Sequence, residues 1–282
     1  MTELLTGKEV ATSITEGLVK RCADLKAKGK VPTLAIVRVG EDPADMAYER
    51  GAGNRAAKVG VEVLKLALPE DTDTEALIKK IDKLNADDDV DGILVLRPLP
   101  SHIDDDAVRN AVAEKKDVDG IGDRAMAGVY SGKKIGYPPC TAEACMEILK
   151  YYGVELKGKR AVVIGRSLVI GRPVAMMLMA KHATITICHT RTEEMDKVAK
   201  GADVLIAAAG KAKAVTEDFV KDGQVIIDVG INVDEEGNMT GDVDFDEVSK
   251  KNVRITPVPG GVGAVTTSVL MKHVVDAAER KL

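Results

Sequence analysis

Residues 160–171 read RAVVIGRSLVIG, and this stretch decides the fold. Its apolar, β-branched beginning predicts a buried strand, and the residues after the turn predict the start of a helix. Gly165 permits a tight turn, and Gly171 lets the helix pack closely. Because N–H groups at a helix start bind phosphates, the pattern predicts a dinucleotide site with the residues Gly165, Arg166, Ser167 and Gly171. A plain strand-to-helix turn is the alternative, since such glycine turns are common.

The end of the next predicted strand indicates which dinucleotide binds. NAD-preferring folds usually carry Asp or Glu there to bind the ribose 2′-hydroxyl. This chain instead reads CHTRT over residues 188–192, with Arg191 and no carboxylate. An arginine attracts a 2′-phosphate, so we expect NADP rather than NAD, with help from Arg166. The competing interpretation is that Arg191 is an ordinary solvated surface charge.

Strands and helices alternate along the whole chain, which predicts an α/β fold with parallel sheets. We expect helices over residues 7–28, 74–85 and 264–280. A further helix should begin at the N-cap Asp42, with Pro43 in its first turn, and end at Gly60. One helix is also expected between each pair of later strands. A loop-rich stretch near 117–140 separates two series, so we predict two α/β domains. The predicted strands are 33–39, 61–68, 91–96, 160–165, 183–188, 202–210 and 223–230.

Composition and charge exclude several classes of protein. The chain has 282 residues, is 45% hydrophobic and carries a net charge of −5, so we expect neither nucleic acid nor a membrane as a partner. No signal peptide or transmembrane run is recognisable, which makes the cytoplasm the expected location. No metal site is expected, because the four cysteines and four histidines lack ligand spacing. These residues are Cys22, Cys140, Cys145, Cys188, His102, His182, His189 and His273.

Two further segments have the composition of ligand-facing loops. Residues 228–232 (DVGIN) end a predicted buried strand, and residues 257–263 (PVPGGVG) precede the last helix. Three glycines and two prolines in seven residues specify a rigid backbone that another group can approach closely. The spacing alone does not say which ligand these loops face.

Taken together, the motifs resemble the methylenetetrahydrofolate dehydrogenase/methenyltetrahydrofolate cyclohydrolase family of bifunctional bacterial type, over nearly the whole chain. Nine motifs in order carry the resemblance, which makes it highly specific. They are EDPAD-x-x-Y (41–48), PLP (98–100), KDVDG (116–120), PCT (139–141), VIGRS-x-x-x-G-x-P (163–173), CHTRT (188–192), DVGIN (228–232), GDVDF (241–245) and TPVPGGVG (256–263).

The resemblance implies a folate domain (1–138 plus the returning helix 264–282) and a Rossmann-type NADP domain (139–263), joined across a cleft, and a homodimer. It implies NADP-dependent oxidation of 5,10-methylenetetrahydrofolate in one-carbon metabolism and purine biosynthesis. Tyr48 and Asp119 are implied as catalytic and folate-binding residues, although Tyr48 could be ordinary packing and Asp119 a turn residue. Further folate contacts are implied at Pro98, Pro259, Gly260, Gly261, Val262 and Gly263, and cofactor contacts at Gly165, Arg166, Ser167, Thr190 and Ile231.

Two positions depart from the family pattern. The family has lysine four residues after the tyrosine and glutamine before L-P-L-P, where this chain has Ala52 and Leu96. Neither side chain can transfer a proton, as cyclohydrolase chemistry requires, whereas hydride transfer depends on positioning. We therefore expect a dehydrogenase with weak or absent cyclohydrolase activity. The alternative is a fully bifunctional enzyme in which a basic residue substitutes, with Arg50, Arg55, Lys58 and Arg97 as candidates.

Two other functions stay open on sequence grounds. A shikimate-type or amino-acid dehydrogenase can share two α/β domains and an NADP turn, although the loops at 116–120, 137–141 and 256–263 argue against it. A non-catalytic protein that binds NADP or folate would also explain the missing lysine. Formation of NADPH from each candidate substrate would separate these functions.

Overall fold

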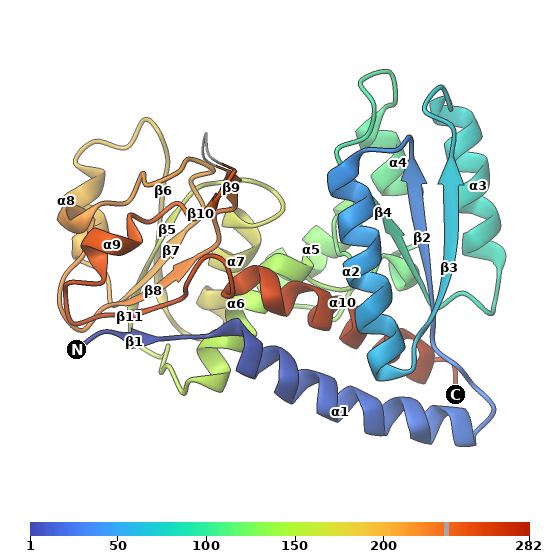
Figure 1. Ribbon diagram of the computed structural model, residues 1–282, viewed down its shortest axis with the longest axis horizontal. Coiled ribbons are helices and arrows are strands. Elements are labelled where there is room, and N and C mark those ends of the chain that lie inside the picture. Colours follow the sequence, from blue (N-terminus) through green and yellow to red (C-terminus); the bar gives the residue numbers. More distant parts are fainter. Residues whose placement is uncertain (234–236) are drawn as a thin grey trace. The chain divides into compact units, whose positions relative to one another are not determined.

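The computed structural model describes residues 1–233 and 237–282 (Figure 1). The chain divides into two compact units. Unit 1 comprises Met1–Thr12 and Thr141–Thr266, and unit 2 comprises Ser13–Cys140 and Thr267–Leu282. The helices α1 (Gly7–Ala27) and α10 (Val262–Glu279) each begin in unit 1 and end in unit 2.

Unit 1 contains a six-stranded sheet in the order β1-β11-β8-β7-β5-β6, in which every strand pair is parallel. The first strand accounts for one difference from the expected division. The expected folate domain begins at residue 1, whereas Met1–Thr12 lie in unit 1, because Glu3 and Leu4 pair with Arg254 and Ile255. The strands are β1 (Glu3–Leu4), β5 (Arg160–Ile164), β6 (Thr184–Cys188), β7 (Val204–Ala207), β8 (Val225–Asp228) and β11 (Arg254–Ile255).

The central strands of this sheet are buried because their apolar runs match a sheet that is covered on both faces. Every residue of β7 and of β8 is buried. One apolar cluster includes Ile164, Leu205 and Ile226 from three neighbouring strands, and Met195 and Val198 of α8 pack against it. The helices of unit 1 are α6 (Cys140–Tyr151), α7 (Gly171–Ala180), α8 (Met195–Lys200) and α9 (Phe245–Val248).

The crossover between β7 and β8 differs from the predicted helix, and that prediction is wrong. This segment contains only the 3₁₀ turn η2 (Glu217–Phe219). Residues 210–213 form a bend and a turn, and Val215 then pairs in extended form: its N donates to Asp242 O at 2.9 Å, and it forms a bridge with Val243. This extended pairing uses the N–H groups that a helix would need. A short antiparallel pair, β9 (Asn232–Val233) and β10 (Met239–Thr240), lies nearby in the sequence.

Unit 2 contains a parallel three-stranded sheet in the order β3-β2-β4, flanked by α2 and α3 (Figure 1). The predicted ends of α2 (Pro43–Val59) are confirmed: Asp42 accepts hydrogen bonds from Ala44 N and Asp45 N, and Gly60 ends the helix with φ 90°. The remaining elements are β2 (Thr33–Val39), β3 (Glu62–Leu68), α3 (Thr74–Ala86), β4 (Gly92–Val95), α4 (Asp105–Ala111), η1 (Glu114–Lys116) and α5 (Asp123–Ser131).

Within residues 1–233 and 237–282, no helix has the length and apolar character that crossing a membrane requires. The same residues contain no group of three or more His, Cys, Asp or Glu side chains placed to hold a metal ion. All four cysteines are buried and free of disulfides.

Candidate functional site

The glycine turn after β5 is built as the sequence predicts. Gly165 has φ 121°, and a Cβ there would lie 2.0 Å from the carbonyl oxygen of Ala208. A Cβ on Gly171 would lie 2.3 Å from the carbonyl oxygen of Gly165. Since real Cβ atoms do not approach backbone oxygens so closely, both positions require glycine. The two glycines thereby bring the start of α7 against the end of β5.

The turn exposes several backbone N–H groups. Ser167 Oγ accepts from Ile170 N at 3.2 Å and from Gly171 N at 3.3 Å, which satisfies two donors at the start of α7. Within the part of the chain that the structure describes, the N–H groups of residues 166–169 have no acceptor. These exposed donors and the positive end of α7 form an arrangement that binds anions. The turn can therefore hold the phosphates of a dinucleotide.

The end of β6 lies beside this turn. Gly165 N donates to Cys188 O at 2.9 Å, which connects the glycine turn to the neighbouring strand. The loop that follows is fixed by His189, whose N donates to Thr192 Oγ1 at 2.9 Å and whose Nδ1 accepts from Arg191 N at 3.1 Å. Thr190 and Arg191 are exposed. The guanidinium of Arg191 has no carboxylate partner among the described residues, so it is free to meet an added anion.

Two buried carboxylates, which stand in the motifs DVGIN and GDVDF, support the loop that carries Ile231, a role that the sequence did not reveal. Asp228 accepts three hydrogen bonds of 3.0 Å from the N–H groups of residues 230, 242 and 243. Burial raises the pKa of Asp228 to about 6, although these hydrogen bonds lower it. Asp242 accepts from Gly210 N at 2.8 Å, Lys211 N at 3.0 Å and Asn232 Nδ2 at 3.0 Å.

The signal for this network was the pair of glycines beside the two aspartates. A Cβ on Gly230 would lie 2.3 Å from Asp242 Cγ, and one on Gly241 would lie 1.9 Å from Asp228 Oδ2. Only glycine therefore fits at either position. The network leaves Ile231 63% exposed, which makes its apolar side chain available to a ligand.

The predicted substrate loop at residues 259–263 also lies in unit 1. Gly7 N donates to Gly260 O at 2.8 Å, and a Cβ on Gly7 would lie 2.0 Å from Gly261 O. The start of α1 thus holds this loop by close backbone contact, a role of Gly7 that the sequence analysis missed. Pro259, Gly260 and Gly263 are exposed, whereas Gly261 and Val262 are buried. The side chain of Ile231 lies near Gly263, 3.6 Å from the position of an added Cβ.

Tyr48 and Asp119 both lie in unit 2, and the charge of Asp119 acts on Tyr48. Burial raises the pKa of Asp119 to about 6; the charge of Asp117 raises it further, and the Arg97 guanidinium lowers it. Burial also raises the pKa of Tyr48 above its ordinary value, and the charge of Asp119 adds to this effect. Tyr48 therefore stays protonated and can donate a hydrogen bond, whereas Asp119 can change its charge near neutral pH.

The loop that carries Asp119 is held by its own neighbours. Asp117 Oδ1 accepts from Gly120 N at 3.0 Å, and Asp117 Oδ2 accepts from Gly122 N at 2.8 Å. Cys140 N donates to the carbonyl oxygen of Asp119 at 3.2 Å. These bonds hold the backbone on both sides of Asp119 in place. Pro98 is exposed and follows a cis peptide bond.

The two positions that depart from the family pattern are both buried. Ala52 is 0% exposed and Leu96 is 5% exposed. Ala52 follows Tyr48 by four residues in α2, so the two lie on the same helix face. Neither residue provides a group that can move a proton at this place.

The four candidate substitutes for the lysine differ in their surroundings. Arg50 and Lys58 are exposed. Arg55 Nη1 donates to Thr15 Oγ1 at 3.1 Å. Arg97 is ion-paired with Asp105, yet its charge reaches Asp119. Arg97 follows the end of β4 at Val95, so it does not belong to the strand itself.

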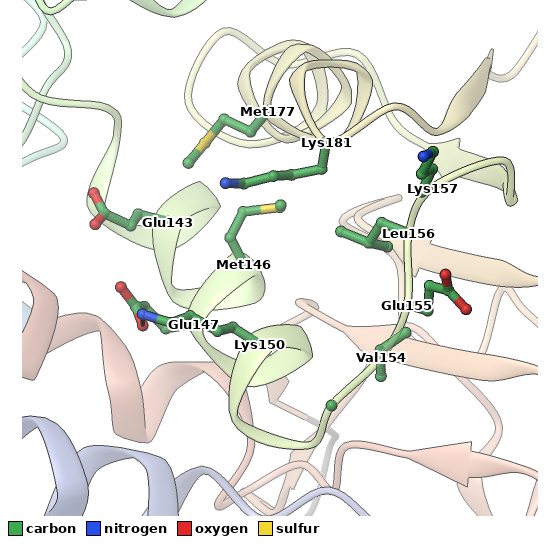
Figure 2. A pocket seen from close by; sticks show the side chains of 11 residues that line it. Glu143, Met146, Glu147, Lys150, Val154, Glu155, Leu156, Lys157, Met177 and Lys181 are labelled. Carbon is green, nitrogen blue, oxygen red and sulfur yellow. Dashed lines mark ion pairs between the residues drawn. The ribbon is translucent and has the colours of Figure 1, made fainter.

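A separate pocket of about 720 Å³ lies in unit 1 and contains none of the predicted site residues. It is formed by α6, the loop at residues 153–157 and the last part of α7. Figure 2 shows Lys181 between Met177 and Met146 in this pocket. Gly171 begins α7 and Lys181 follows its end, so the pocket lies about 15 Å along the helix from the glycine turn.

The parallel sheet, the glycine turn and the exposed N–H groups at the start of α7 define the class of protein: a Rossmann-type dinucleotide-binding α/β protein with a second α/β unit. Family models identify it further. Residues 5–119 match the tetrahydrofolate dehydrogenase/cyclohydrolase catalytic domain, and residues 139–282 match the NAD(P)-binding domain of the same family. The chain therefore belongs to the tetrahydrofolate dehydrogenase/cyclohydrolase family, as the sequence predicts.

Individual relatives agree with this assignment. The bifunctional protein FolD of Alkaliphilus oremlandii is 50% identical over 277 residues, which cover 98% of this chain and 97% of that protein. The solved structure of the bifunctional FolD enzyme from Campylobacter jejuni has a TM-score of 0.98 at 40% identity and covers 100% of both chains. The Trypanosoma brucei enzyme, solved with NADP and an inhibitor, has a TM-score of 0.93 at 34% identity and covers 99% of this chain and 98% of that one.

Proposed function

We propose that this chain oxidises 5,10-methylenetetrahydrofolate to 5,10-methenyltetrahydrofolate with NADP as the oxidant. The observation that carries the proposal is the glycine turn at 165–171, where four N–H groups have no acceptor among the described residues. Family membership supports the folate substrate, and the printed description of the Trypanosoma brucei relative supports NADP. When bound, NADP supplies the acceptor for the hydride that leaves the folate methylene carbon.

The residues of unit 1 would hold the cofactor. The phosphates would bind at the start of α7, beside the turn that Gly165 and Gly171 make possible, with Arg166 and Ser167 next to them. Arg191 would bind the 2′-phosphate through its free guanidinium, and Thr190 would provide a hydroxyl beside it. Ile231 would contact the cofactor through its exposed apolar side chain. Residues 139–263 would together form the NADP-binding domain.

The residues of unit 2 would hold the folate. Asp119 would accept hydrogen bonds from the N–H groups of the pterin, which requires the ionised carboxylate. Tyr48 would position the folate and stays protonated beside Asp119. Pro98 and the residues 259–263 would complete the folate contacts. Such positioning is the main task of a protein in hydride transfer, because the cofactor supplies the reactive group.

We further propose that cyclohydrolase activity in this chain is weak or absent. The support is the chain's own residues: Ala52 and Leu96 are buried and cannot transfer protons, Arg55 is hydrogen-bonded to Thr15, and Arg50 and Lys58 are exposed. Loss of general acid–base catalysis typically lowers a rate about 10²–10⁴-fold. The relatives' names give them both activities, so a fully bifunctional enzyme is the alternative, with Arg97 as the substitute.

The experiment measures both reactions with the purified protein. We expect NADPH formation from methylenetetrahydrofolate and little hydrolysis of methenyltetrahydrofolate above the spontaneous rate. Introducing Ala52→Lys together with Leu96→Gln should restore hydrolysis. Ala57→Lys, on the exposed side of α2, is the matched control and should change neither reaction. Robust hydrolysis by the unchanged protein would disprove the second proposal, and absence of NADPH would disprove the first.

The same assays separate the competing functions. A shikimate-type dehydrogenase would reduce NADP with shikimate; the shikimate dehydrogenase of Aquifex aeolicus shares the fold, with a TM-score of 0.53 at 17% identity. A non-catalytic binding protein would bind both ligands without forming NADPH.

We also propose a cytoplasmic homodimer that serves one-carbon metabolism and purine biosynthesis, without nucleic acid or membrane partners. Light scattering at micromolar concentration would test the oligomeric state.

A further inference from the structure

A buried histidine that the proposed chemistry does not use lies behind Asp119. His273 is 1% exposed and belongs to the part of α10 that lies in unit 2. Its Nδ1 lies 2.7 Å from the carbonyl oxygen of Val118, the residue before Asp119. Because a carbonyl oxygen only accepts, Nδ1 must carry the proton of this hydrogen bond. The contact therefore fixes the tautomer of His273.

The same carbonyl oxygen receives a second donor. Cys140 Sγ donates to Val118 O at 3.2 Å and lies 3.6 Å from His273 Nδ1. Cys140 also donates its backbone N–H to the carbonyl oxygen of Asp119 at 3.2 Å. The two carbonyl groups that flank the Cα of Asp119 are thus held from two elements, α10 and the start of α6. Movement of either donor would rotate the backbone that directs the Asp119 carboxylate.

The ring of His273 is itself held in place. The ring of Tyr137 lies 4.9 Å from it, centroid to centroid, with an angle of 30° between the planes. The Arg280 guanidinium lies 4.6 Å from the Tyr137 centroid. Tyr137 is 3% exposed and His273 is 1% exposed, so the two rings lie in the interior of unit 2. Because the imidazole ring is packed on this side, it has little freedom to rotate. Nδ1 therefore stays in the position from which it donates to Val118 O.

We propose that His273 is a positioning residue for the folate site, which aims the Asp119 carboxylate through its hydrogen bond to the Val118 carbonyl. The inference rests on the proposed function, because that function assigns Asp119 to the pterin. His273 touches neither substrate nor cofactor in this account. Its charge, when protonated, also lowers the pKa of Asp119.

Two amide variants test the geometry. In His273→Asn the amide nitrogen occupies nearly the place of Nδ1, whereas in His273→Gln it lies near the place of Nε2, away from Val118. The readouts are the dissociation constants of 5-formyltetrahydrofolate, which does not react, and of NADP, both by calorimetry. We expect His273→Gln to weaken the folate probe about tenfold, because the Val118 carbonyl loses its nearer donor and keeps only the weak thiol donor of Cys140. His273→Asn should bind the probe as the wild type does, and NADP binding should not change in either variant.

Equal folate affinity in the two variants, or parallel weakening of NADP, would overturn the proposal. If His273→Gln does not fold, nitrogen-15 NMR of histidine-labelled wild type decides. A proton on Nδ1 and a shift of the His273 signal on addition of the folate probe, but not of NADP, support the proposal, and a proton on Nε2 alone overturns it. The binding assay needs no turnover, so failure of the dehydrogenase reaction is detected separately as an absence of NADPH.

Discussion

Replacing Arg191 by serine should change the choice between NADP and NAD. The Arg191 side chain is exposed, and its guanidinium has no carboxylate partner among the described residues. Its substitution therefore removes no ion pair within the described residues, and we expect the stability to change little. The backbone of the loop should also persist, because His189 N donates to Thr192 Oγ1 and Arg191 N donates to His189 Nδ1 through atoms that the substitution leaves in place.

The magnitude follows from the contact that would be lost. A hydrogen bond between charged groups contributes about 1.5–3 kcal/mol, which corresponds to roughly 10–150-fold in binding. Because Arg191 is exposed, solvent screening favours the lower end of this range, about tenfold. We therefore expect the KM for NADP to rise about tenfold in Arg191→Ser. The KM for NAD should stay the same, because NAD lacks the 2′-phosphate.

The assay is NADPH or NADH formation from methylenetetrahydrofolate at low and at high salt. The effect on NADP should shrink at high salt, as expected for an exposed charge. Arg160→Ser is the matched control: Arg160 begins β5, at the other end of the strand from the glycine turn, and lies 3.7 Å from Asp203. An equal rise in KM for both cofactors, or no change for NADP, would refute the role of Arg191.

Three further outcomes are expected. Since the pKa of Asp119 is raised to about 6, its carboxylate is ionised above that pH and becomes protonated below it. The kcat/KM for the folate should therefore fall as the pH drops through 6. Asp119→Asn should remove this pH dependence from the rate profile. Gly171→Ala would place a Cβ 2.3 Å from the Gly165 carbonyl oxygen and should raise the KM for NADP at least about tenfold in steady-state kinetics, with a destabilisation of about 1–3 kcal/mol. Gly51→Ala in the exposed interior of α2, where an added Cβ meets open space, should stabilise unit 2 by about 0.5–1 kcal/mol in thermal unfolding, and a lower Tm would contradict this.

Local residue patterns predicted the parts of this protein that depend on local physics. The strand at 33–39 and both ends of α2 follow from a β-branched run, from the cap at Asp42 and from the left-handed Gly60. The helix predicted before β8 failed, because Val215 pairs with a segment almost thirty residues away. No local pattern reports such a long-range hydrogen bond, and the same holds for the pairing of Glu3 with Arg254.

The sequence by itself determined the class of fold, the glycine turn and the family. At the turn only glycine fits, and both such glycines and the order of the motifs can be read along the chain without knowledge of the fold. Only the tertiary structure decided the environment of each side chain. It placed Asp228 and Asp242 beneath the Ile231 loop, buried Ala52 and Leu96, and brought His273 within 2.7 Å of a carbonyl oxygen 155 residues earlier in the chain. Burial and the charges of distant residues set the pKa of a carboxyl group, and both exist only after the chain has folded.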